Sequence, residues 1–332
     1  MPPGRTTDVL CLGHALVDRL AHVEPELVAS GGLELGAMTL VDGGRAASLA
    51  RLAARWRQVS GGSAANTAAG IASLGGRPAF VGSVGPDELG AGYDLDLESV
   101  GVRCVLAVAG DSVSTGQCLV LVTPDAQRTM ATDLGAGAQI DTAAVERAGV
   151  HESAAVYLEG YLFDSPGTHA AMERALQLAK DSATLVAVSL SDPFLVDRHP
   201  EALNKLVAER ADIVFCNEEE ARMLTGAADL DGVLAGLSRP GLVAAVTLGA
   251  RGAVLVAGDE RVHVHAWPVS GVEDTTGAGD LFAAGTLFGL THGCSLEVAG
   301  RLGSLAAGEV IGHLGARPDT SLEHLAFEAG LL

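Results

Sequence analysis

Basic residues are scarce in this sequence: 21 Lys plus Arg stand against 41 Asp plus Glu, and the formal net charge at pH 7 is −20. Nucleic acid and anionic membrane surfaces require a basic footprint, so the charge argues against both as partners. An anionic substrate would need a local electropositive site. Only two lysines, Lys180 and Lys205, are present, and neither follows a glycine. A P-loop NTPase, with its G-x-x-x-x-G-K-[ST] motif, is therefore excluded.

Cysteines and long apolar runs are sparse as well. The five cysteines are odd in number and none belongs to a C-x-x-C pair. They indicate buried apolar residues in a reducing compartment rather than a disulfide or zinc framework. No apolar run reaches membrane-spanning length, and the N-terminal residues lead into a strand pattern at 8–12 without the features of a signal peptide. We therefore expect a cytoplasmic protein.

Aromatic residues make up only 4%, which leaves Ala, Val and Leu to build the core. With 48% hydrophobic residues and 43 glycines, the 332 residues predict a turn-rich globule of one large α/β domain or two ordinary ones. After strand patterns at 8–12 and 78–84, helix and strand patterns alternate from residue 141 onward. The later strands are expected at 154–159, 184–190, 212–216 and 242–248, with a hairpin at 253–257 and 261–266. This alternation predicts a mainly parallel sheet with helices on both faces.

Two stretches, 13–51 and 100–125, interrupt the alternation with short, irregular elements. We expect them to form a small β lid on one α/β body. The body would then comprise residues 1–12, 52–99 and 126–332, and would bind both nucleotide and substrate.

The segment Asp274-Thr275-Thr276-Gly277-Ala278-Gly279-Asp280 lies where a helix pattern begins. Its Gly-Ala-Gly turn presents consecutive backbone N–H groups, which together with the helix dipole form an anion site. Asp280 would repel a bound phosphate. It has a role if it takes a proton from a hydroxyl while the N–H groups stabilise a phosphoryl group in transfer. The alternative is a capped helix N-terminus with a glycine-rich turn.

Other polar residues follow expected strands, where ligands bind in doubly wound sheets. They are Asp18 after the first strand, the turn 61–66, the run 217–220 and the loop 247–252. Taken singly, each is more typical of a turn, a helix cap or solvated charge.

Two of these segments together resemble the signatures of a known family. Gly-Gly-x-x-x-Asn at 61–66 and Asp-Thr-Thr-Gly-Ala-Gly-Asp at 274–280, with Asn-x-x-Glu at 217–220 between them, are similar to motifs of the PfkB (ribokinase-like) family of sugar and nucleoside kinases. Segments 40–42, 121–125, 159–162 and 191–194 resemble a bacterial branch commonly labelled adenosine kinase. The resemblance implies a three-layer αβα ribokinase-like fold with a small β lid, and ATP- and Mg²⁺-dependent phosphoryl transfer to an alcohol.

The resemblance also implies roles for particular residues. Asp280 matches the catalytic base, and the backbone N–H groups of Gly277, Ala278 and Gly279 match the anion hole. The positions that bind the acceptor are matched by Asp18, His14, Gly62 and Asn66. His14 stands where many adenosine-specific members carry an asparagine, which leaves the identity of the acceptor open.

On the nucleotide side, the resemblance implies that Thr247 and Gly249 lie beside the ATP phosphates and ribose. Asn217 and Glu220 match the element that organises Mg²⁺, often through water, which suits an ion that gives up its water reluctantly. Asp274 and Thr276 match positions that hold a monovalent cation such as K⁺ in many relatives.

The leading prediction is a kinase that converts adenosine to AMP. A sugar kinase of the ribokinase or fructokinase type is the nearest alternative, since fold alone does not separate the two. A non-catalytic nucleotide-binding regulator is a further one. Relatives suggest a homodimer joined through the lid. For Arg128, an exposed strand charge is favoured over a lid residue near the acceptor.

Overall fold

The computed structural model describes residues 4–125 and 127–332. Its larger sheet has nine strands in the order β14-β13-β12-β11-β10-β9-β1-β5-β6. In chain order these are β1 Thr7–Leu12, β5 Pro78–Val84, β6 Arg103–Val108, β9 Ser153–Glu159, β10 Leu185–Ser189, β11 Ile213–Asn217, β12 Val243–Thr247, β13 Ala253–Ala257 and β14 Glu260–Val264. The run from β6 to β12 is parallel, and β13 and β14 extend it as antiparallel strands. The mainly parallel sheet expected from the alternating pattern is confirmed.

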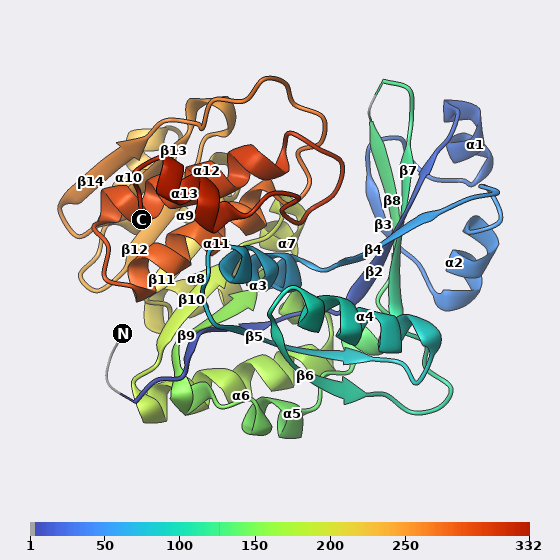
Figure 1. The fold of residues 1–332 in the computed structure, drawn as a ribbon, viewed down its shortest axis with the longest axis horizontal. Coiled ribbons are helices and arrows are strands. Elements are labelled where there is room, and N and C mark those ends of the chain that lie inside the picture. The colour runs from blue at the N-terminus through green and yellow to red at the C-terminus, as the bar shows by residue number, and fades with distance from the viewer. Residues whose placement is uncertain (1–3, 126) are drawn as a thin grey trace.

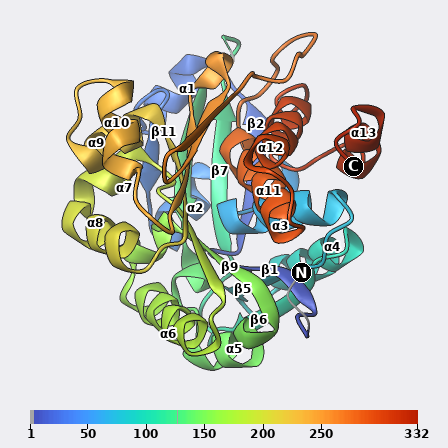
Figure 2. The ribbon, with the colours of Figure 1, turned by 90° about the vertical axis from the view of Figure 1, so that its left-hand side faces the viewer.

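Helices cover both faces of this sheet, as two views of the ribbon show (Figures 1 and 2). Successive residues of β1 point to opposite faces: Leu10 and Leu12 belong to one core cluster, and Val9 and Cys11 to the other. The first cluster packs under α5 Thr142–Arg147, α6 Pro166–Ser182, α7 Pro193–Arg198, α8 Pro200–Glu209, α9 Glu218–Thr225 and α10 Leu230–Leu237. The second packs under α3 Ser63–Ser73, α4 Glu88–Ser99, α11 Ala278–Thr291, α12 Leu296–Val310 and α13 Leu322–Glu328. The prediction of three αβα layers is confirmed.

A second sheet of five strands, here called the lid sheet, stands beside the body, on the right in Figure 1. Its order is β3 Met38–Leu40, β8 Arg128–Asp133, β7 Gly116–Val122, β2 Leu16–His22 and β4 Arg57–Gly61. Helices α1 Pro25–Ser30 and α2 Gly43–Leu49 cover one face through Val28 and Leu49. The other face, with Cys118 and Val120, packs near Leu314 of the body. One face of the lid sheet is therefore turned toward the α/β body.

The strand partners change the boundaries that the sequence predicted for the lid. Strand β6, inside the expected lid stretch 100–125, pairs with β5 in the larger sheet. Strands β4 and β8, inside the expected body, pair with β2 and β7 in the lid sheet. An apolar-rich pattern identifies a strand but not its neighbour, because pairing is decided by long-range packing. Residues 1–3 and 126, assigned to the body from the sequence, lie outside the described residues.

The chain reverses its direction of winding between β1 and β9. From β1 it proceeds outward through β5 to β6, then returns to β9 on the other side of β1 and continues to β12. In open α/β sheets a ligand site forms beyond the carboxyl ends of the strands at such a point. His14 follows β1 and Glu159 ends β9, so both stand at this point.

All five cysteines are free thiols, and Cys11, Cys118 and Cys216 are buried. Within residues 4–125 and 127–332, no helix combines the length and the apolar character that crossing a membrane requires.

Candidate active site

The carboxylate of Asp280 is held by two side chains of α3. Ser63 Oγ donates to Asp280 Oδ1 at 2.6 Å, and Asn66 Nδ2 donates to Oδ2 at 3.0 Å. Helices α3 and α11 approach closely because α3 is built of small residues: a Cβ added at Gly70 would lie 2.7 Å from the Cβ of Ala284. The two glycine-rich segments, 61–66 and 274–280, therefore meet in one site.

Ser63 does not cap α3. The N-cap is Gly62, with φ 96°, and α3 has no side-chain cap. Because Ser63 lies one residue inside the helix, its hydroxyl is free to bind Asp280. The sequence contained no signal for this contact, since it depends on how α3 and α11 pack.

The pKa of Asp280 is raised to about 6, chiefly by burial. The hydrogen bonds from Ser63 and Asn66 favour the ionised form and limit this rise, whereas the negative charge of Glu159 adds to it. A carboxylate with a pKa near 6 is ionised at neutral pH and is a stronger proton acceptor than an ordinary aspartate. These are the properties of a general base.

The three residues before Asp280 are the N-cap and the first two residues of α11. Gly277 is the N-cap with φ 80°, and the first-turn N–H groups of a helix have no partner within the helix. The two glycines of the turn have different surroundings. A Cβ on Gly277 would lie 2.7 Å from the Cα of Ala316, whereas a Cβ on Gly279 would meet no atom within 4 Å. Gly277 therefore allows close packing, and Gly279 borders open space.

That open space is part of a cavity of about 440 Å³. Its walls include Thr247 and Gly249, the two residues expected beside ATP, together with Ala278 and Gly279 of the turn. Apolar groups line most of the rest, among them Trp267, Phe282, Ala307 and Ile311. At this end of the cavity the Ala278 N–H donates to the Thr275 carbonyl oxygen at 3.3 Å. A largely apolar cavity of this size that ends at the N-terminus of a helix suits an aromatic base joined to an anionic tail. Trp267 had no recognisable sequence signal.

Asp18 lies on β2 of the lid sheet. A Cβ at Gly61 would lie 2.3 Å from Asp18 Oδ2, so the carboxylate packs directly on the backbone of β4. Burial raises the pKa of Asp18 to about 7, the positive charges of Arg317 and Arg128 lower it, and Asp280 raises it further. Asp18 lines a small pocket together with Arg128 and Thr276, so it belongs to the same site.

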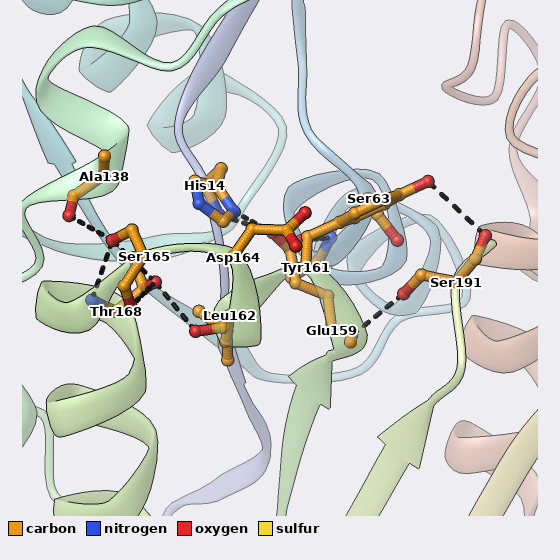
Figure 3. Close-up of polar contacts among 12 residues, drawn as sticks. His14, Ser63, Ala138, Glu159, Tyr161, Leu162, Asp164, Ser165, Thr168 and Ser191 are labelled. Carbon is orange, nitrogen blue, oxygen red and sulfur yellow. Dashed lines mark hydrogen bonds and ion pairs between the residues drawn. The ribbon is translucent and has the colours of Figure 1, made fainter. Parts of the chain in front are cut away.

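His14 forms a buried pair with Glu159 (Figure 3). Glu159 Oε1 accepts from the backbone N–H of His14 at 2.8 Å and lies 2.6 Å from His14 Nδ1, and Oε2 accepts from the backbone N–H of Ala64 at 2.9 Å. Glu159 thus joins the ends of β1 and β9 to the first turn of α3. In the sequence, residues 159–162 carry only part of a resemblance, and no role is predicted for Glu159. An acidic residue ending an otherwise apolar strand was the available signal.

Asn217 and Glu220 form a capping box at the start of α9. Asn217 Oδ1 accepts from the Glu220 N–H at 2.8 Å, while the Glu220 carboxylate accepts from the backbone and side-chain N–H groups of Asn217 at 3.0 and 2.7 Å. Burial raises the pKa of Glu220 to about 7. Asn217 is the strand neighbour of Thr247, so the box stands next to the cavity.

These contacts define how a divalent ion fits. Both oxygens of Glu220 are used by Asn217, so the pair suits contact with a metal through water more than direct ligation. Among the described residues, no three His, Cys, Asp or Glu side chains are grouped closely enough to hold a metal ion by themselves.

The interpretation of Arg128 as an exposed strand charge is wrong. Its side chain is 16% exposed and reaches from β8 to the body, where Nη2 pairs with Asp274 Oδ2 and Nη1 donates to Thr276 Oγ1 at 2.6 Å. The cause is that β8 belongs to the lid sheet and carries Arg128 on the face turned toward the body. Arg128 therefore lies at the site.

Solved structures resemble the whole chain. The crystal structure of adenosine kinase from Sinorhizobium meliloti is 41% identical, with a TM-score of 0.90 over 97% of this chain and 99% of that one. A probable sugar kinase from Rhizobium etli is 39% identical, with a TM-score of 0.93 over 99% of this chain and 100% of that one. The fold is therefore the ribokinase-like α/β fold, and the protein is a phosphotransferase with an alcohol group as acceptor.

Sequence comparison agrees. The model of the pfkB family carbohydrate kinases matches residues 6–323. The adenosine kinase of Saccharomyces cerevisiae is 28% identical over 93% of this chain and 96% of its own length. The chain belongs to the PfkB family. Kinases of this family use ATP and a divalent metal ion.

Proposed function

We propose that this kinase transfers the γ-phosphoryl group of ATP to a primary hydroxyl of a nucleoside, with adenosine as acceptor and AMP as product. One observation carries the proposal: the Asp280 carboxylate, in the first turn of α11, is held by Ser63 and Asn66 of α3. A carboxylate able to accept a proton, in the first turn of a glycine-rich helix start, supports this reaction.

In the proposed reaction, Asp280 takes the proton of the acceptor hydroxyl. The oxygen of that hydroxyl forms a bond to the γ-phosphorus of ATP, and the bond between the γ-phosphorus and the oxygen of the β-phosphate breaks. The N–H groups of Gly277, Ala278 and Gly279 stabilise the negative charge on the transferred group. Positioning and electrostatics of this kind are the main catalytic contributions to phosphoryl transfer.

ATP would occupy the cavity of about 440 Å³, with its base against the apolar wall and its phosphates toward the turn. Thr247 and Gly249 would lie beside the phosphates and ribose. Bound Mg²⁺ would neutralise phosphate charge, and Glu220 with Asn217 would hold it through water.

Two buried polar atoms on the acceptor side support a hydroxyl-rich acceptor. Asn66 Oδ1 and His14 Nε2 have no hydrogen-bond partner in the described part of the chain. Buried polar atoms without partners are rare in native proteins and point to a bound group or water. Together with the carboxylate of Asp18 and the backbone of Gly62, they offer the contacts that ribose hydroxyls need.

Similarity over nearly whole chains to proteins named adenosine kinase favours a nucleoside over a free sugar. The sugar kinase alternative is retained because the Rhizobium etli relative is named a probable sugar kinase. His14 stands at the position where the difference would be decided, since its imidazole can bind either a base or a sugar hydroxyl.

A panel of acceptors with ADP release as the readout tests the proposal. We expect turnover with adenosine, and none with Asp280→Asn under the same conditions. Turnover on ribose or fructose without turnover on adenosine would establish the sugar kinase instead. A protein that binds ATP but shows the same rate as Asp280→Asn on every acceptor would be a regulator.

A further inference from the structure

The carboxylate of Asp274 is enclosed by hydrogen-bond donors. Oδ1 accepts from the backbone N–H of Thr276 at 2.9 Å, and Oδ2 accepts from that of Gly315 at 3.0 Å. Oδ2 also pairs with the guanidinium of Arg128. The side chain of Asp274 is fully buried, so its charge is neutralised by Arg128 rather than by solvent.

Arg128 also binds Thr276 Oγ1, the second side-chain oxygen that a monovalent cation would use. Its Nη1 donates to Thr276 Oγ1 at 2.6 Å while Nη2 pairs with Asp274. A monovalent ion bound to both side chains would compete with the guanidinium for the same oxygens. Two positive charges at one buried carboxylate would also repel each other strongly. The residues present therefore do not fit the monovalent cation implied by the resemblance.

We infer that Arg128 is the cation of this site, replacing a monovalent metal ion at Asp274 and Thr276. The guanidinium holds the segment 274–276 directly before the Gly277–Gly279 turn, and Arg128 is thus a positioning residue for the anion hole. Because Arg128 belongs to β8, the lid sheet supplies this positive charge. A metal ion bound to Asp274 and Thr276 would instead be held by the α/β body. The expected effect on the kinase rate rests on the proposed function, whereas the assignment of Arg128 as the cation does not.

The test compares K⁺ with choline at equal ionic strength in the wild type, Arg128→Ala and Arg128→Ala/Asp274→Asn. Thermal unfolding is measured for each, and binding of Tl⁺, a probe for K⁺ sites, is followed by thallium NMR in nitrate salts. Arg19→Ala is the matched control. Arg19 is on β2 of the lid sheet, but it bonds Gln117 and stacks over the Trp56 ring at 5.4 Å without reaching the body.

We expect the wild type and Arg19→Ala to unfold at the same temperature in both salts and to bind no Tl⁺. Arg128→Ala should bind Tl⁺ and gain roughly 2–4 °C in Tm in K⁺, the size expected when a ligand fills a new site. The double variant should lose both responses. The kinase rate of the wild type should be equal in K⁺ and choline.

Two results would overturn the inference. One is Tl⁺ binding or K⁺ activation in the wild type, and the other is an Arg128→Ala variant as insensitive to K⁺ as the wild type. Unfolding and Tl⁺ binding require no acceptor. A failure of the acceptor panel would therefore refute the proposed function without affecting this test.

Discussion

The hydrogen bond from Ser63 to Asp280 controls the pH at which the proposed base becomes protonated. The Ser63 hydroxyl donates to the carboxylate at 2.6 Å and lowers its pKa, while burial raises that pKa to about 6. Ser63→Ala removes the donor and leaves burial in place. The pKa of Asp280 therefore increases, and activity is lost at a higher pH as the solution is acidified.

The size of the effect follows from the strength of such a bond. A hydrogen bond to a charged group contributes about 1.5–3 kcal/mol, and one pKa unit corresponds to about 1.4 kcal/mol. The acidic limb of kcat/KM should therefore move from a midpoint near pH 6 to about pH 7–8 in Ser63→Ala. At pH 6.5 the ionised fraction would fall about 3- to 25-fold. The assay is ADP release at saturating ATP across pH 5–9.

Thr67→Val provides the control within the same helix. Thr67 Oγ1 donates to the backbone oxygen of Asp280 at 3.2 Å and not to its carboxylate. The acidic limb of kcat/KM in Thr67→Val should therefore keep the wild-type midpoint. The reasoning is refuted if the limb does not move in Ser63→Ala, or if Thr67→Val moves it equally.

Other substitutions test the remaining parts of the site. Asp280→Asn should lower kcat by about 10²–10⁴ with ATP binding retained, and an unchanged kcat would exclude it as the base. Gly277→Ala should lower Tm because its Cβ would lie 2.7 Å from the Cα of Ala316. Gly279→Ala, with no atom within 4 Å of its Cβ, should keep the wild-type Tm and lose ATP turnover. Equal Tm losses in the two glycine variants would contradict this distinction. Trp267 borders the cavity, so ATP should change its fluorescence, and Trp267→Phe should abolish that change. A response that survives the substitution would show that the signal does not come from this cavity.

The order of strands and helices in the body could be read from the sequence because it is local. Residues 212–216 and 242–248 carry the apolar runs of buried strands, and the structure has β11 and β12 there. The glycine-rich turn before Asp280 was recognisable for the same reason, since helix starts and tight turns depend on a few adjacent residues. The resemblance assigned Asn66 and Asp280 to one reaction, and the bonds of Ser63 and Asn66 to Asp280 show that segments 61–66 and 274–280 lie together.

Partners far apart in the chain could not be read in this way. Arg128 lies 148 residues before Thr276, and β8 exposes it to the body only because β8 pairs with β7 in the lid sheet. Glu159 reaches His14 across 145 residues. Nothing adjacent to Arg128 distinguishes it from an ordinary strand charge, and the acidic end of β9 did not reveal the partner of Glu159.

Local sequence alone thus determined the α/β class, the positions of most body elements and the presence of a turn able to bind an anion. These depend on apolar periodicity, helix termini and backbone conformation, which act over short stretches. The tertiary structure alone decided which charges meet: Asp280 with Ser63 and Asn66, and Arg128 with Asp274. Such pairs form only after packing of the sheets and helices has removed water and set the distances, because electrostatic energy depends on separation in space and on burial rather than on separation along the chain.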